Sequence, residues 1–397
     1  MRGFPGRSLM HRIALSTITL VLAVAAFEGL CRLLDVDFNP HAHWQYHPEL
    51  GWTQARSKTF TERKHGENVI VQFNSLGFRD LDHSFFKPEG VRRIVILGDS
   101  FSEALQVNLD DTYWRQLQLM LNGGQTGPWE VINLGVGDYG SMQELLALRR
   151  YGLRFEPDIV ISQIFPLNDI CNNTLELAGL CKSRNDRYRP YAALRQGQLV
   201  PVWDQPLRHK LRSSLVSFGV LERAYLQFVA QETGQVQERQ HQARIAQRGL
   251  PADPLIYTLA RDKDQIDQVR RGWSMTERIL EETARECRQR GIPWLPVVVP
   301  FFARVGTAFP EFQRSYPHVP LARDYPEQRL RRFFHRLEVP SVMALEIFDE
   351  YPHLALPPRG GHLNPNAHRL VAQAIYRQLI DSQWVEPLTT REVGESQ

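Results

Sequence analysis

The chain has 397 residues, of which 43% are apolar and 23% are charged. This length allows one large α/β domain or two smaller ones, and the apolar share permits a sizeable core, which excludes global disorder. The formal net charge is +3, and the sequence has no cluster of Lys and Arg interleaved with aromatic residues. Nothing in it therefore predicts a nucleic-acid partner.

Residues 1–35 predict a short cytoplasmic tail and a membrane anchor. Three arginines within the first twelve residues precede an uncharged apolar run from Ile13 to Phe27, and apolar residues continue after Glu28. A basic flank of this kind keeps the N-terminus in the cytoplasm. The run alone is shorter than the roughly 20 residues of a spanning helix, and Ala23–Ala25 offers a cleavage pattern. We prefer an uncleaved anchor to a cleaved signal peptide or a buried amphipathic helix.

Residues 36–90 predict an irregular lead-in, rich in His, aromatic and turn residues. A short strand is expected at Val69–Phe73, followed by a turn at Asn74–Gly77.

Residues 91–385 predict one α/β domain, because short apolar runs alternate with amphipathic helical patterns. Asp110 and Asp111 are expected to cap the first of these helices. The expected strands are Arg93–Leu97, Trp129–Leu134, Asp158–Phe165 and Trp294–Val299, with a mixed segment at Ser341–Phe348. The expected helices run through Trp114–Leu121, from Ser141, and over Gln265–Gln289, Pro326–Leu337 and Pro365–Ile380.

A polar stretch at 171–262 interrupts this alternation and predicts an insertion, with a helix at Leu211–Ala230, that forms a lid or a partner surface. Cys171 and Cys181 within it either pair in an oxidising compartment or stay as buried thiols. Residues 386–397 are expected to be a flexible tail.

Polar residues follow three of the expected strands. Gly98-Asp99-Ser100 follows the first, Gly135–Gly140 the second and Asn168-Asp169 the third, while Gly361-His362 precedes the last helix. The carboxyl ends of parallel strands meet at one edge of a sheet, where ligands bind. The sequence therefore predicts a site at this edge.

The four segments resemble, in this order, the conserved blocks of the SGNH/GDSL hydrolase superfamily. Leu97-Gly98-Asp99-Ser100 is similar to the serine block, Asn133–Gly140 to the glycine block, Pro166–Asp169 to the asparagine block and Gly361–Pro365 to the histidine block. The resemblance covers roughly Val91–Leu379. It implies a three-layer α/β/α fold with a mostly parallel, flavodoxin-like sheet.

The resemblance also implies a serine esterase mechanism. Ser100 is the expected nucleophile and His362 the expected base. The expected oxyanion hole combines the backbone N–H of Ser100, an N–H of the turn at Gly137 and Asp138, and the side-chain amide of Asn168.

Three positions depart from the family pattern. Family members commonly carry an aspartate two or three residues before the histidine, where this chain has Gly360 and Arg359. A Ser–His dyad, a substitute carboxylate from Asp349 or Glu350, and an impaired enzyme all remain open. In addition, Asp138 stands at the expected glycine of the turn, and Leu167 stands near the expected glycine of the asparagine block.

The predicted function is hydrolysis of an acyl ester, with an O-acetyl ester as one candidate, on a small molecule or glycan. The alternatives are acyl transfer to an exported glycan and a non-catalytic glycan-binding or scaffold protein. The predicted location is the bacterial inner membrane, crossed once, with the catalytic domain in the periplasm. Gly135–Gly140 also fits a dinucleotide-binding turn, but the expected acidic residue is misplaced. No Cys/His cluster has zinc spacing, so neither a cofactor nor a metal is expected.

Overall fold

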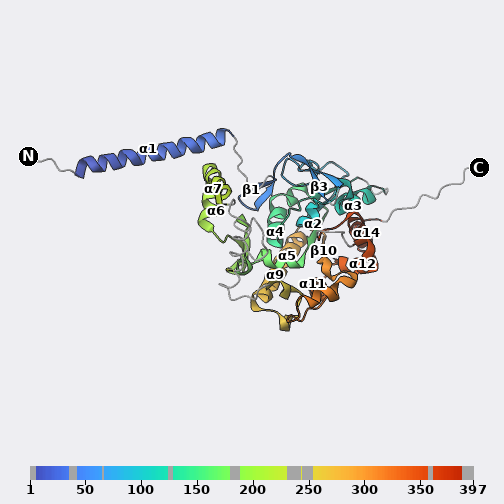
Figure 1. Ribbon diagram of the computed structural model, residues 1–397. Helices are drawn as coiled ribbons and strands as arrows, with labels where there is room; N and C mark the ends of the chain where they lie inside the picture. Colours follow the sequence, from blue (N-terminus) through green and yellow to red (C-terminus); the bar gives the residue numbers. More distant parts are fainter. Residues whose placement is uncertain are drawn as a thin grey trace, which may run out of the picture.

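The computed structural model describes residues 6–34, 43–64, 67–123, 128–178, 188–229, 243, 254–355 and 361–386. Its centre is a parallel five-stranded sheet in the order β11-β10-β7-β5-β6, with helices on both faces (Figure 1). The predicted α/β fold class is therefore confirmed. The strands are β5 (Arg92–Leu97), β6 (Trp129–Asn133), β7 (Ile159–Ile164), β10 (Trp294–Val298) and β11 (Val342–Met343).

Helices cover both faces of the sheet, which explains why its strands are nearly continuous apolar runs. Every residue of β7 and β10 is buried, as expected for a parallel sheet between two helical layers. One face packs against α3 (Tyr113–Asn122), α12 (Ala344–Glu350) and α14 (Pro365–Asp381). The other packs against α4 (Ser141–Arg150), α9 (Asp267–Gln289) and α11 (Tyr325–Arg336).

The start of α3 differs from the prediction. Asp110 and Asp111 lie in a short 3-10 turn, and the cap is Thr112, whose Oγ1 accepts the Arg115 N–H at 3.4 Å. The helix begins at Tyr113 because Tyr113 and Trp114 are fully buried in the core. Tertiary packing has thus set the boundary.

The lead-in contains more regular structure than the sequence predicts. It forms two antiparallel hairpins, β1 (Trp44–His47) with β2 (Gly51–Gln54) and β3 (Thr59–Lys64) with β4 (Glu67–Gln72). Trp52 in β2 is buried in the same core as α4 and α9. The first hairpin is therefore part of the domain that carries the site.

The described part of 171–262 also joins the core. Leu177, Tyr188 and Tyr191 are buried. The expected helix at Leu211–Ala230 is instead two helices that break at Leu215, and Gln231–Gln242 lies outside the described residues. The elements here are α5 (Pro166–Asn173), β8 (Tyr191–Arg195), β9 (Gln198–Val202), α6 (Pro206–Ser214) and α7 (Val216–Val229). The short helices elsewhere are α2 (Ser100–Glu103), α10 (Phe309–Arg314) and α13 (Pro352–Ala355).

The N-terminal helix α1 (Gly6–Leu33) projects from the domain (Figure 1). Its segment Met10–Leu33 has 24 residues and a mean hydropathy of 2.0, so it is long and apolar enough to cross a membrane. None of its 18-residue apolar window is buried against the domain.

Two polar residues near the end of α1 hold it to α7. The Glu28 carboxylate accepts the backbone N–H groups of Val216 at 3.1 Å and Ser217 at 2.8 Å, at the start of α7. Arg32 donates to the Ser214 carbonyl oxygen at 2.9 Å and pairs with Glu28 at 2.7 Å. We call these contacts the Glu28–Arg32 clamp.

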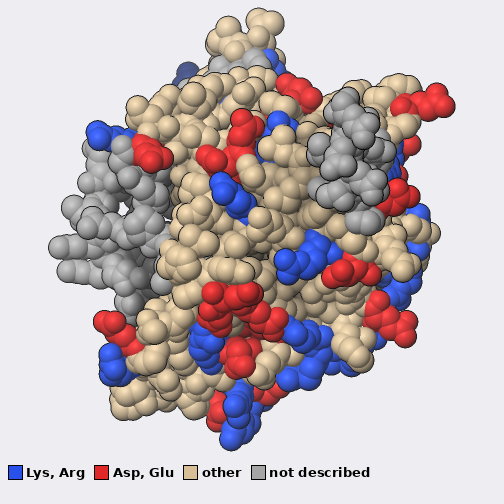
Figure 2. Space-filling model, turned by 90° about the vertical axis from the view of Figure 1, so that its right-hand side faces the viewer, with Lys and Arg blue, Asp and Glu red and all other residues tan. Residues whose placement is uncertain are grey.

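The face turned away from α1 carries acidic and basic side chains interspersed with one another (Figure 2). Among the cysteines, Cys31 and Cys287 are free thiols, whereas Cys171 is disulfide-bonded. Cys181, its partner in one of the two alternatives, lies outside the described residues.

Candidate active site

The candidate site lies at the carboxyl ends of the neighbouring strands β5 and β7. The connections that follow these two strands run to opposite sides of the sheet. β5 is followed by β6 on one side, and β7, on the other side of β5, is followed by β10. Neighbouring strands of this kind leave a crevice at their carboxyl ends, and ligands bind there in open α/β sheets. Ser100 follows β5 and Asn168 follows β7.

Ser100 is the first residue of α2, directly after the turn that ends β5. The helix cap is Asp99, whose side chain accepts the Phe101 N–H at 3.0 Å. A Cβ at Gly98 would lie 2.2 Å from the Ser102 Oγ, so only glycine fits this tight turn. The turn leaves the Ser100 side chain half-buried at the sheet edge.

His362 meets Ser100 across 262 positions of sequence. Its Nε2 lies 2.9 Å from the Ser100 Oγ, and its ring packs 5.0 Å from the Phe101 ring centroid. Buried Leu363 anchors the loop in the core, and the Asn364 side chain caps α14 by accepting the Ala367 N–H at 2.8 Å. The two residues expected to share chemistry are thus within hydrogen-bond distance.

The carboxylates considered as partners of His362 have other contacts. Asp349 accepts the Gly306 N–H at 3.1 Å and pairs with Arg323. Glu350 accepts a hydrogen bond from the Tyr351 hydroxyl, which raises the pKa of Tyr351. Arg359 and Gly360 lie outside the described residues.

The turn after β6 contains a residue with left-handed backbone geometry. Asp138 has φ +68°, in the left-handed region that non-glycine residues avoid. The Gly137 N–H donates to the buried Glu103 carboxyl, and a Cβ at Gly137 would lie 2.7 Å from Glu103 Oε2. Since Glu103 belongs to α2, this bond ties the turn to the serine helix.

Asn168 lies between the serine turn and the Asp138 turn. Its Nδ2 donates to Asp99 Oδ2 at 3.0 Å and to the Tyr139 carbonyl oxygen at 3.1 Å. Asn172, one helical turn further along α5, donates to the Asn168 Oδ1 and to the Asp138 carbonyl oxygen. Asn172 is a buried residue of α5 that holds the Asp138 turn.

Two residues that sequence reasoning missed also bind the Asp138 turn. Trp52 Nε1 donates to the Gly137 carbonyl oxygen at 3.2 Å. Arg189, fully buried, donates to the Asp138 carbonyl oxygen at 2.5 Å. The aromatic alternation around Trp44 and Trp52 was a signal for the hairpin, but no local pattern marks either residue as a neighbour of this turn.

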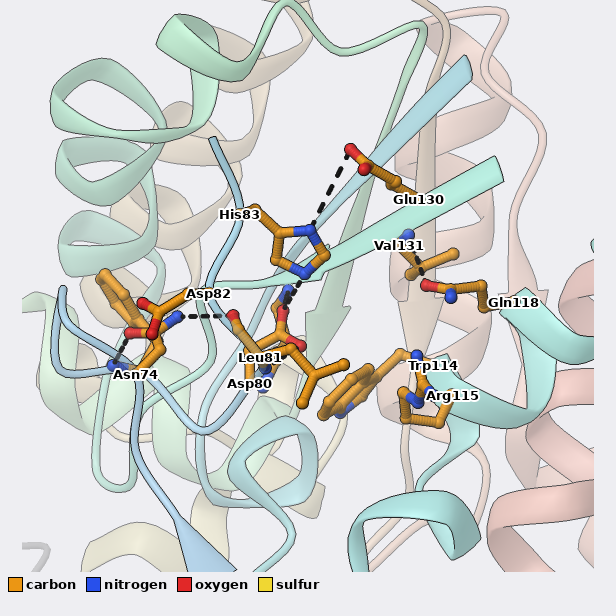
Figure 3. A network of polar contacts seen from close by, with 12 residues as sticks. Asn74, Asp80, Leu81, Asp82, His83, Trp114, Arg115, Gln118, Glu130 and Val131 are labelled. Carbon is orange, nitrogen blue, oxygen red and sulfur yellow. Dashed lines mark hydrogen bonds and ion pairs between the residues drawn. The ribbon is translucent and has the colours of Figure 1, made fainter. Parts of the chain in front are cut away.

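Asp80, His83 and Glu130 form a polar network beside β6 (Figure 3). Asp80 Oδ2 accepts the Asn133 N–H at 2.7 Å and lies 3.4 Å from His83 Nε2. Asn133 in turn donates to the Ser102 carbonyl oxygen at 3.1 Å, and its Oδ1 accepts the Gly135 N–H at 3.0 Å. The end of β6 is therefore bonded to the serine helix.

Three carboxyl groups are buried close to these turns. Burial raises the pKa of Asp99 to about 6, against bonds from Phe101 and Asn168 that lower it. Burial likewise raises the pKa of Glu103 to about 7 and, together with the charge of Asp99, raises the pKa of Asp169. The Asp169 carboxylate accepts the Ser141 N–H at 2.8 Å and the Phe165 N–H at 2.9 Å, so it holds the loops together.

Burial of Glu103 gives a testable pH dependence of stability. Its pKa is raised from 4.5 to about 7, so the folded state holds its proton more tightly than the unfolded state. This tighter proton binding adds to the free energy of unfolding. The added free energy is complete below about pH 4.5 and is lost as the pH rises through about 7. Glu103→Gln keeps a neutral side chain, so we expect the variant to gain stability relative to wild type between pH 5 and pH 8. The gain is up to about 3 kcal/mol, since one pKa unit is worth about 1.4 kcal/mol.

The measurement is urea unfolding of both proteins at the two pH values. Glu282→Gln is the control, because bonds from Arg285 lower the pKa of Glu282, so its titration lies below pH 5 and the free-energy difference from wild type should not change between pH 5 and pH 8. A free-energy difference between wild type and Glu103→Gln that does not change with pH would contradict a buried, proton-binding Glu103.

His368 is a structural residue in the core. It is 1% exposed, and its Nδ1 accepts the Tyr113 N–H at 3.2 Å. Burial lowers the pKa of His368 to about 3, so the ring is neutral. In the part of the chain that the structure describes, no group of three or more His, Cys, Asp or Glu could hold a metal ion.

No family model and no curated protein sequence matches the chain. Among solved structures, it is similar to TesA at 11% identity and a TM-score of 0.35, over 72% of this chain and 98% of that one. It is similar to the acetyl xylan esterase AlAXEase at 13% identity and a TM-score of 0.38, over 72% and 100%. A third is an acetylxylan esterase from Geobacillus stearothermophilus, at 10% identity and a TM-score of 0.39, over 72% and 94%. Two other similar structures are a lipolytic protein of the G-D-S-L family and a GDSL-like lipase, at TM-scores of 0.35 and 0.33.

Proposed function

We propose that the protein is a membrane-anchored serine esterase that hydrolyses an acyl ester, with Ser100 as nucleophile and His362 as general base. The observation that carries the proposal is the 2.9 Å contact between Ser100 Oγ and His362 Nε2, at the carboxyl edge of the sheet. A nucleophile and a base within hydrogen-bond reach are what acyl transfer through a serine requires.

In the proposed reaction, His362 Nε2 takes the hydroxyl proton as Ser100 Oγ bonds to the ester carbon. The carbonyl oxygen becomes an oxyanion, which accepts hydrogen bonds from the backbone N–H groups of Ser100 and Asp138. His362 then returns the proton to the departing alcohol. Water attacks the acyl-serine by the same route, which releases the acid and restores Ser100.

Asn168 is the third proposed oxyanion donor, and Gly137 is not among the proposed donors because its N–H is bonded to Glu103. The Asn168 amide hydrogens point at Asp99 and at the Tyr139 carbonyl oxygen. A bound ester has to draw one of them away. Catalytic hydrogen bonds often take their final form only when substrate binds.

A fluorophosphonate probe tests the proposal on the full chain in detergent or nanodiscs. We expect wild type to be labelled and Ser100→Ala to stay unlabelled, and wild type to turn over a short-chain aryl ester. Labelling that persists in Ser100→Ala would exclude Ser100 as the nucleophile. An acetylated glycan product that forms faster than free acetate, when a glycan acceptor is added, would assign transfer in place of hydrolysis.

We also propose that α1 is an uncleaved anchor. The Glu28–Arg32 clamp supports this, because it bonds the end of α1 to the first N–H groups of α7. Cleavage after Ala25 would keep these residues but would leave them on a loose N-terminus without the helix that presents them. The site then faces the side of the membrane opposite the basic N-terminus.

The anchor predicts the mass of the mature protein. We expect the full 45.9 kDa chain, extractable from membranes by detergent but not by alkaline carbonate. Ala25→Leu, which removes the small-residue pattern, should leave the mass unchanged. A shorter protein found in the soluble fraction would contradict the anchor.

A further inference from the structure

We infer that Trp52 and Arg189 are positioning residues for the proposed esterase reaction, because they hold the Asp138 turn in the conformation that presents its N–H to an oxyanion. The inference rests on the proposed function. Neither residue is part of the four sequence blocks. Trp52 comes from the lead-in hairpin and Arg189 from the segment that follows α5.

The peptide between Gly137 and Asp138 carries the proposed donor. In a trans peptide the carbonyl oxygen and the next N–H point in opposite directions. By binding the Gly137 carbonyl oxygen, Trp52 Nε1 therefore fixes the direction of the Asp138 N–H. Loss of this single bond would free the peptide to rotate.

The alternative orientation of this peptide is less strained. A flip of the Gly137–Asp138 peptide would change φ of Asp138 by about 180°, from +68° to the ordinary negative region. A left-handed non-glycine residue costs on the order of 1 kcal/mol or more. Contacts from the rest of the protein must therefore hold the turn in its present form.

Arg189 and Asn172 supply the second group of contacts. Both donate to the Asp138 carbonyl oxygen, at 2.5 Å and 3.0 Å, and so fix the next peptide of the turn. Arg189 also donates to Gln143 Oε1 at 2.8 Å, which holds its guanidinium in place. Since arginine keeps its charge when buried, it adds a positive charge beside the turn.

Trp52 and Arg189 form one unit. The Arg189 guanidinium lies 4.9 Å from the centroid of the Trp52 ring, and the Tyr139 ring packs edge-on at 5.6 Å. Trp52 is 2% exposed and Arg189 is 0% exposed. Because buried groups of this kind have few alternative positions, the lead-in hairpin and the segment after α5 both set the geometry of the turn.

Trp52→Phe tests the inference because it keeps an aromatic ring and removes the N–H. We expect kcat for an aryl ester to fall about 10- to 100-fold with KM nearly unchanged, since removal of one oxyanion donor typically costs 100- to 1000-fold. Inhibition by a boronic acid, which forms a tetrahedral adduct with a serine, should weaken by the same factor as kcat/KM. Arg189→Met should also lower kcat and weaken inhibition by the boronic acid.

The matched control is Trp294→Phe, which removes a buried indole N–H that donates to Ser162 Oγ at 2.9 Å, away from the turn. We expect this control to lose a similar amount of thermal stability and to keep its kcat. Trp52→Phe/Asp138→Gly should regain part of the lost kcat, because glycine adopts a positive φ without strain.

Equal kcat in Trp52→Phe and Trp294→Phe would overturn the inference. So would a fall in kcat without weaker boronate binding. Both outcomes are separate from failure of the proposed function, in which the wild-type chain itself would neither label with the fluorophosphonate nor turn over the ester.

Discussion

Replacing Ser100 by alanine is expected to lower kcat/KM for an aryl ester on the order of 10⁶-fold, the loss typical of a serine nucleophile. His362→Ala is expected to cause a loss of similar size. The reason is that the two side chains act on one proton, across the 2.9 Å between Ser100 Oγ and His362 Nε2. Either change alone removes the activated nucleophile.

The double variant sharpens this prediction. Ser100→Ala/His362→Ala should be no slower than either single variant, because residues that act as a unit are strongly non-additive. The measurement is initial rates of the three variants and wild type, with correction for hydrolysis in buffer. Losses that multiply in the double variant would mean that Ser100 and His362 act independently, and would refute the pairing.

Arg79→Met is expected to lower the free energy of unfolding by about 2–6 kcal/mol, because it leaves buried carbonyl oxygens without their donor, at a cost of about 1–3 kcal/mol each. Arg79 is 0% exposed and donates to the carbonyl oxygens of Glu103 at 3.0 Å and of Val107 at 2.5 Å, and also to that of Ala104. Its charge also offsets the Glu103 carboxylate. The variant leaves the carbonyl oxygens of Glu103 and Val107 without this donor, while that of Ala104 keeps the Val107 N–H at 3.3 Å.

Urea unfolding of Arg79→Met beside Arg278→Met measures this effect. Arg278 is a suitable control because its pair with Glu281 is exposed, and exposed pairs contribute about 0–1 kcal/mol. The same variant should raise the pKa of Glu103, which would move the pH dependence of stability upward. If Arg79→Met loses no more free energy of unfolding than Arg278→Met, the buried guanidinium is dispensable for stability.

The sheet, with Ser100 at its edge, could be predicted from local patterns, whereas the pairing of Ser100 with His362 was expected from the resemblance to the SGNH/GDSL hydrolases. Apolar runs mark β5, β6, β7 and β10 within one or two residues of their ends. The rule that ligands lie at the carboxyl ends of parallel strands then places Ser100 and Asn168 at one edge. Neither step needs knowledge of a long-range contact beyond the strand order.

The supports of the Asp138 turn could not be predicted in this way. Trp52 lies 85 positions from Gly137, and Arg189 lies 51 positions from Asp138. A buried Trp or Arg has no local sequence pattern that names its partner, and the lead-in was expected to be irregular. The same limit applies to Thr112, where core packing rather than the acidic pair decides the start of α3.

If α1 is the membrane anchor proposed above, the Glu28–Arg32 clamp has a consequence for the substrate. A domain joined to its membrane helix by chain alone would tumble above the bilayer and sample many heights and directions. A second attachment at the start of α7 restricts rotation of the domain. Ser100 would then lie within a narrow range of heights above the bilayer and in one preferred orientation. Esters carried on membrane-bound molecules would then meet it at a high local concentration, and esters free in solution would gain nothing from the anchor.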